Sequence, residues 1–128
     1  MLKRFPGPRK GRPYVAVVRA GDMVYTAGYT GFETDGTVPE DFGAQVRLIL
    51  DKARANLERA GSSLDRVVSV TVYLTDQERD REALDAAFRE AFAHAPPARA
   101  TVEVKALSDP AKRVEMQFVA HADRVAGE

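Results

Sequence analysis

Valine-rich stretches with a period of two open the main part of the chain. Residues 14–19 (YVAVVR) and 23–28 (MVYTAG) are joined by Ala20-Gly21-Asp22, which has the composition of a tight turn. Alternation of apolar and polar residues is typical of a strand with one buried face. We therefore predict a β-hairpin over these residues.

The same alternation returns in the second half of the chain. It covers residues 66–74 (RVVSVTVYL), 99–106 (RATVEVKA) and 113–121 (RVEMQFVAH). Ser108-Asp109-Pro110 supplies a turn between the last two stretches. These patterns predict three more strands, the last two of them paired as a second hairpin.

Two segments between the strands carry apolar residues at helical spacing. The first follows Thr37-Val38-Pro39-Glu40, which has the spacing of a capping box, and ends at Gly61. The second follows Thr75-Asp76-Gln77-Glu78, with the same spacing, and ends before Pro96-Pro97. The apolar positions are Phe42, Val46, Ile49, Leu50, Ala53 and Leu57, then Leu84, Ala87, Phe88, Ala91 and Phe92. Both segments are predicted to be amphipathic helices.

The predicted order of elements is β-β-α-β-α-β-β, which indicates an α+β domain with one sheet and both helices on one face. The other face would be bare in a monomer. It also carries sizeable side chains, such as Tyr73. Because a large exposed apolar surface is unusual in a monomer, we expect this face to be covered by self-association.

Composition limits the classes of function. The chain has 128 residues, enough for one domain, with Lys+Arg 19 balanced by Asp+Glu 19. A neutral chain argues against nucleic acid or an acidic membrane as the main partner. It has no cysteine and no segment of membrane-spanning length, so we expect a cytoplasmic protein without disulfides or thiolate metal sites.

The charge is unevenly distributed near the N-terminus. Lys3, Arg4, Arg9, Lys10 and Arg12 are interleaved with glycine and proline. We interpret residues 1–12 as a basic, flexible arm, residues 13–123 as a single domain and residues 124–128 as a tail. A phosphate-contacting arm, whose binding would weaken as salt rises, is the alternative interpretation of the basic residues.

Few residues in this chain can carry chemistry. The two histidines, His94 and His121, lie on different predicted elements, so no metal site is expected. Arg99 opens a predicted strand, where a guanidinium can clamp a carboxylate. Glu115 lies among apolar neighbours and can act as a general base. Tyr14 opens the first strand. The alternative interpretations are that Arg99 and Glu115 are strand-edge charges that form a salt bridge, and that Tyr14 covers the end of the sheet.

Beyond these single residues, the chain resembles the Rid family, the YjgF-type reactive-intermediate deaminases, over roughly residues 13 to 121. The matching stretches are Pro13-Tyr14, GDMVYTAG at 21–28, the helix from Phe42 to Gly61, SSLDRVV at 62–68, VTVYLTD at 70–76, PARATVEV at 97–104 and VEM at 114–116. The last two are the family's most recognisable stretches.

The resemblance implies a chorismate-mutase-like fold assembled as a homotrimer, with active sites in clefts between subunits. It implies hydrolysis of enamines and imines of the 2-aminoacrylate type to 2-keto acids and ammonia, without a cofactor. Carried over by position, Arg99 would hold the substrate carboxylate, and Glu115 with the carbonyl of Thr101 would activate water. Tyr14 would line the cleft, and the backbone of Gly28 would orient the substrate.

Three departures from the family pattern affect the expected site. Ala27 stands where serine is usual, and Tyr29, where glutamine is common, is expected to place a ring beside the cleft. One extra residue lies in the turn at 107–112. These changes keep a second hypothesis open, a divergent member that binds small carboxylates or acts on another imine. A third hypothesis is a role that acts on RNA, since some relatives carry labels such as ribonuclease. In this chain only the basic arm supports it.

Overall fold

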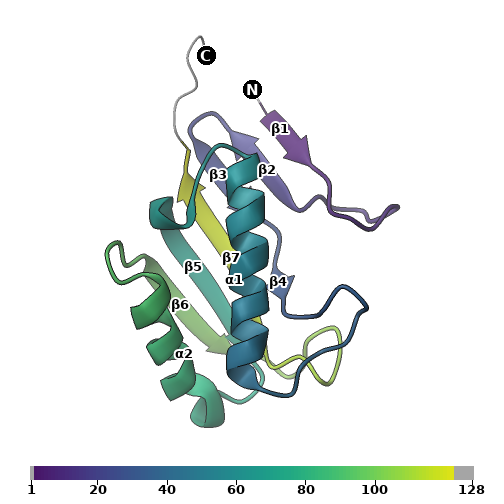
Figure 1. Cartoon of the computed structure of the whole chain (residues 1–128), viewed down its shortest axis with the longest axis vertical. Coiled ribbons are helices and arrows are strands. Elements are labelled where there is room, and N and C mark those ends of the chain that lie inside the picture. Colours follow the sequence, from purple (N-terminus) through teal and green to yellow (C-terminus); the bar gives the residue numbers. More distant parts are fainter. Residues whose placement is uncertain (1, 123–128) are drawn as a thin grey trace.

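One mixed sheet and two helices make up the protein in a computed structural model that describes residues 2–122 (Figure 1). The 7-stranded sheet has the order β1-β2-β3-β7-β5-β6, and β4 also pairs with β7. Both helices cover the same face, which confirms the predicted α+β architecture. The elements are β1 (Leu2–Phe5), β2 (Val17–Ala20), β3 (Met23–Thr26), β4 (Tyr29–Thr30), α1 (Phe42–Arg59), a 3-10 turn at Leu64–Arg66, β5 (Val67–Leu74), α2 (Gln77–Ala91), β6 (Ala98–Glu103) and β7 (Val114–His121).

Aspartates begin both helices. In α2 the side chain of Asp76 accepts a hydrogen bond from the backbone N–H of Arg79 at 3.0 Å, within the predicted capping segment. In α1 the cap is Asp41, which accepts from the N–H of Ala44 at 2.9 Å. The predicted capping box at Thr37 is therefore wrong, because Thr37 instead closes a turn onto the side chain of Asp35.

The second predicted hairpin is also wrong. β5 lies between β6 and β7, parallel to the first and antiparallel to the second. The reason is α2, which returns the chain to the starting end of β5 so that β6 must run parallel to it. The segment from 104 to 113 then crosses past β5 and delivers β7 to its other side.

A short strand replaces the front of the predicted flexible arm. Leu2–Phe5 forms β1 and pairs with β2 from Leu2↔Ala20 to Phe5↔Val17, so the prediction of flexibility is wrong for these residues. Phe5 packs against the core, and the Arg59 guanidinium lies 5.4 Å from its ring centroid. The predicted tail at 124–128 lies outside the described residues.

A buried amide joins the loops at one end of the sheet. Gln45, on α1, is fully buried, and its Nε2 donates to the carbonyls of Pro39 at 2.8 Å and Ala111 at 2.9 Å. Its Oε1 accepts from the N–H of Arg113 at 2.9 Å. A Cβ on Gly31 would collide with the backbone of Gln45, so glycine is required for this close approach.

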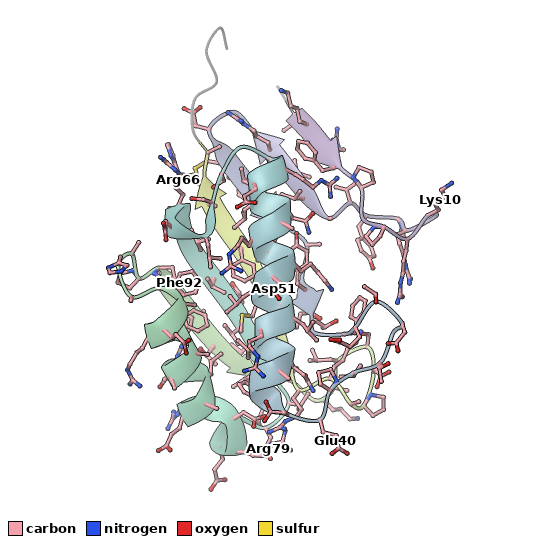
Figure 2. All side chains as sticks on the ribbon, in the orientation of Figure 1. Lys10, Glu40, Asp51, Arg66, Arg79 and Phe92 are labelled. Atoms are coloured by element: carbon pink, nitrogen blue, oxygen red, sulfur yellow. The ribbon has the colours of Figure 1, made fainter. Side chains whose placement is uncertain are left out.

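An ion-pair network continues from this amide. The carboxylate of Asp80, buried in α2, binds the guanidinium groups of Arg113 and Arg79, the latter at 2.9 Å. Arg113 also donates to the carbonyl of Glu40 at 2.8 Å. Arg79 and Glu40 mark this end of the molecule in Figure 2. The network therefore fixes the start of β7 to both helices.

Replacing Asp80 tests the network. Burial alone would raise the pKa of Asp80, but hydrogen bonds from Arg79 and Arg113 outweigh it and hold the pKa below its usual value. Asp80→Asn should cost about 1–3 kcal/mol of unfolding free energy at neutral pH. A carboxyl group whose pKa is lower in the folded than in the unfolded state stabilises the fold only while it is ionised. The difference in unfolding free energy between Asp80→Asn and wild type should therefore shrink as pH falls below about 4.

Urea denaturation across a pH series measures this difference. Asp51→Asn is the matched control, since Asp51 forms an exposed pair with Arg54 at 3.2 Å. Such surface pairs contribute about 1 kcal/mol or less. Equal losses in the two variants would contradict a special role for the buried carboxylate.

Candidate functional site

Glu115 lies on the sheet face opposite the helices. It alternates on β7 with the buried side chains of Val114 and Met116, which face the helices. Its carboxylate rests against Gly28, where an added Cβ would collide with Oε2. The structure therefore brings two predicted site residues together, and the absence of a side chain at Gly28 makes the contact possible.

Two more predicted residues belong to this neighbourhood. The N–H of Ala27 donates to the carbonyl of Ala16 at 3.0 Å, so the chain that follows Tyr14 runs beside Ala27 and Gly28. The side chain of Tyr14 is 62% exposed and Ala27 is partly buried. We call Tyr14, Ala27, Gly28 and Glu115 the acidic half-site.

Arg99 belongs to a different surface. Its Nη2 donates to Oδ1 of Asp85 on α2 at 2.6 Å, and its guanidinium lies 4.8 Å from the ring centroid of Phe88. These contacts place it on the helix side of β6. Thr101 lies two residues further along β6 and so points to the same side. We call Arg99, Thr101 and Asp85 the basic half-site.

An open hollow of about 480 Å³ lies beside the guanidinium of Arg99. It is formed by the end of α2 and the start of β6, where Phe92 is labelled in Figure 2. Its lining residues are Asp85, Phe88, Arg89, Phe92, Ala93, Pro96, Pro97 and Arg99. A small molecule with an anionic group and an apolar part would find both kinds of partner here.

Asp85 was not among the predicted site residues. The Arg99 hydrogen bond is the main cause that holds the pKa of Asp85 below its usual value, so the carboxylate stays charged. In the sequence Asp85 is one of many charged residues on the polar side of a helix, and its spacing gives no signal. Only the packing of α2 beside β6 brings it to Arg99.

The two half-sites do not meet within one chain. Arg99 pairs across the sheet with Val70 of β5, while Glu115 pairs on the other side of β5 with Tyr73. The side chains also lie on opposite faces of the sheet. The alternative interpretation of Arg99 and Glu115 as a pair is therefore wrong, because the ion-pair partner of Arg99 is Asp85.

Tyr29 does not line either half-site. Only 4% of it is exposed, its ring centroid lies 6.2 Å from that of Phe118, and its hydroxyl donates to the carbonyl of Ala16 at 2.7 Å. Burial raises the pKa of Tyr29 far above its ordinary value, so the phenol stays neutral. The expectation of a ring beside the cleft is wrong because this side chain fills the core.

The chemistry available to the half-sites is that of one guanidinium, two carboxylates, a phenol, a threonine hydroxyl and backbone groups. Among residues 2–122 there is no group of three His, Cys, Asp or Glu side chains that could hold a metal ion. Within the same range no helix has the length and apolarity needed to cross a membrane. Acid–base chemistry with water is the reaction type that these side chains fit.

Known proteins resemble the chain along nearly its whole length. The profile of the family described as Endoribonuclease L-PSP matches residues 7–122. The RutC family protein YjgH of Escherichia coli is 39% identical over 84 residues, which cover 66% of this chain and 63% of that protein. A RutC family protein of Pyrococcus abyssi is 33% identical, covering 91% of each chain. The crystal structure of a YjgF/YER057c/UK114 family member from Mycobacterium tuberculosis superposes with a TM-score of 0.83 at 30% identity, covering 95% of this chain and 100% of that one.

The buried role of Tyr29 predicts a stability effect. Tyr29→Phe removes the hydroxyl that binds Ala16 and should cost about 1 kcal/mol of unfolding free energy. Thr34→Val is the control, because it removes a hydroxyl from an exposed loop residue and should change stability by less than about 0.5 kcal/mol. Equilibrium urea denaturation of both variants measures the effect, and an unchanged Tyr29→Phe protein would contradict it.

Proposed function

Because the chain belongs to the Endoribonuclease L-PSP family, with its RutC and YjgF relatives, we propose that it is a cofactor-independent enamine and imine deaminase. Its substrates would be 2-imino acids of the 2-aminoacrylate type, and its products 2-keto acids and ammonia. The observation that carries the proposal is the pair of half-sites, one with a carboxylate against a bare backbone and one with an anchored guanidinium.

A complete site requires a second copy of the chain. Arg99 and Glu115 lie on opposite faces of one sheet. The second sheet face is the one that the helices leave uncovered, and an interface between this face of one subunit and the helix side of β6 of its neighbour would bring the two residues together. That second face leaves Tyr25 and Val102 45% and 43% exposed, which favours its burial by association. We propose a homotrimer, in which such a head-to-tail contact closes into a ring with three sites.

The proposed reaction needs positioning and one base. Arg99 holds the substrate carboxylate, and Glu115 takes a proton from a water molecule held between its carboxylate and the Thr101 carbonyl. The water oxygen bonds to the imine carbon and the proton taken by Glu115 passes to nitrogen, which gives a carbinolamine. The hydroxyl proton of the carbinolamine is then transferred to nitrogen, the carbon–nitrogen bond breaks, and the 2-keto acid and ammonia leave. No electrons are exchanged with another reagent, so the balance closes with water alone.

Asp85 and Ala27 affect which substrates the proposed site would prefer. Asp85 occupies one donor of Arg99 and adds a negative charge beside the proposed carboxylate site, which favours small or weakly charged acids over dianions. Ala27 offers no hydroxyl to a ligand. These two residues also support the second candidate function, a member of the family that binds small carboxylates without turning them over.

Two substitutions distinguish turnover from binding. In the assay, an amino-acid oxidase generates imino acids, and semicarbazide traps the imino acid that the protein has not hydrolysed, so that semicarbazone formation is measured. Glu115→Gln should lower kcat by about 10²–10⁴-fold, the usual contribution of a general base. Arg99→Ala should raise KM, since it removes the group that orients the carboxylate. If 2-keto acids bind to Glu115→Gln and wild type alike, and neither removes any imine, the protein is a binding member.

Mixed oligomers test where the site lies. Arg99→Ala and Glu115→Gln subunits, unfolded and renatured together in equal amounts, should recover about one quarter of wild-type activity, because one in four random head-to-tail contacts pairs the two intact residues. Each variant renatured alone is the control for residual activity. Wild type taken through the same steps calibrates recovery. No gain on mixing would contradict a shared site.

Cleavage of RNA is checked in the same preparations, since the family's description is that of an endoribonuclease. His94 and His121 are both exposed and lie at different elements, one after α2 and one at the end of β7. RNA cleavage that persists in Glu115→Gln would assign that activity to a different site. The cytoplasmic location stays a prediction.

A further inference from the structure

Three cations from distant segments converge on one aromatic ring. Lys52 of α1 has its Nζ 3.7 Å from the ring centroid of Phe32, Lys112 has its Nζ at 5.0 Å, and the guanidinium carbon of Arg9 lies at 5.2 Å. We call Arg9, Lys52 and Lys112 the cation cluster. The loops that carry Arg9, Phe32 and Lys112 lie on the same side of α1, the helix that carries Lys52 (Figure 1).

The cluster has no carboxylate to balance it. Among the residues that the structure describes, none of the three cations forms an ion pair. Lys52 donates instead to the carbonyl of Thr30 at 3.0 Å, and Lys112 donates to the hydroxyl of Ser108, also at 3.0 Å. Elsewhere on α1 the arginines Arg47 and Arg54 each have an aspartate partner.

The pKa of Lys52 reflects its burial and the neighbouring positive charges. Burial, together with the charges of Lys112 and Arg9, lowers the pKa of Lys52 to about 8. A group that is half-buried with cations as its charged neighbours is destabilised until an anion approaches. Phe32 offers each cation a favourable ring face, which holds the three together without neutralising them.

We propose that Arg9, Lys52 and Lys112 form a binding site for a small phosphate-bearing anion, with Phe32 as its apolar wall. A phosphate carries close to two negative charges at neutral pH and several oxygens, enough to accept from two ammonium groups and a guanidinium at once. A monocarboxylate offers only one charge. The site is compact rather than a stripe along one face, which fits a small anion rather than a nucleic-acid strand.

This site is separate from the proposed deaminase chemistry. Lys52 lies on the helix layer, while the carboxylate of Glu115 lies on the opposite face of the sheet. Arg9 comes from the basic N-terminal segment, so the site gives that segment a function that the deaminase proposal does not use. Binding here and deaminase activity can therefore succeed or fail independently.

Calorimetric titration of the full chain with inorganic phosphate and pyrophosphate tests the proposal. Wild type should bind pyrophosphate more tightly than acetate, and the affinity should fall between 50 and 200 mM salt as the charges are screened. Lys112→Ala and Arg9→Ala should each weaken binding by about tenfold, the effect of losing one charge-assisted contact. Lys52→Met keeps the apolar stem and should weaken it at least as much.

Lys10→Ala is the matched control, because Lys10 carries the same charge next to Arg9 but points away from the body of the protein (Figure 2). Its affinity for pyrophosphate should stay within about twofold of wild type, since it makes no short-range contact. Equal losses of pyrophosphate affinity in Lys10→Ala and Lys112→Ala would show that binding is non-specific electrostatic attraction, which would overturn the proposed site. Absence of binding at 50 mM salt, or acetate binding as tight as pyrophosphate, would also overturn it.

Discussion

The buried amide of Gln45 is the interaction on which the arrangement of this end of the molecule depends. One side chain binds two carbonyls and one N–H that come from two loops, the one before α1 and the one before β7. Because the amide makes all three hydrogen bonds only when both loops are in place, it couples them. Arg113 is then fixed, and Glu115 follows it on β7 after one residue. The position of the candidate base is thus set by a side chain on the far side of the sheet.

The basic half-site is held by different contacts. Arg99 depends on Asp85 and Phe88 of α2, and not on the loops that Gln45 joins. The protein therefore has two separately supported polar groups, one on each side of its sheet. Each is ordered in advance, and bringing them together requires an interface rather than a movement within the chain. Preorganisation of this kind lowers the entropy that binding a small substrate would otherwise cost.

Local rules predicted much of the fold, and the failures share a cause. Helical spacing identified both helices, and the Thr75–Glu78 segment contained the true cap of α2. Glu115 was singled out from its apolar neighbours, whereas Gly28 was named only through the family resemblance. The sequence patterns did not predict which elements lie next to each other. Alternation marks a strand but not its partner, so the insertion of β5 between β6 and β7 was missed. A four-residue strand among basic residues carries too little pattern to distinguish it from an arm. Asp85 reaches Arg99 only through the packing of α2, and the hydroxyl of Tyr29 binds the carbonyl of Ala16 in the segment before β2.

The position of Tyr29 has a consequence for anyone who wants to redesign this protein. Its phenol is committed to the core and to the carbonyl of Ala16, so varying that codon in a mutant library would mostly generate poorly folded clones. Tyr14, Ala27 and Asp85 are different, since each adjoins a half-site and none is deeply packed. Diversity concentrated at these three codons would sample new ligand preferences while the scaffold stays intact.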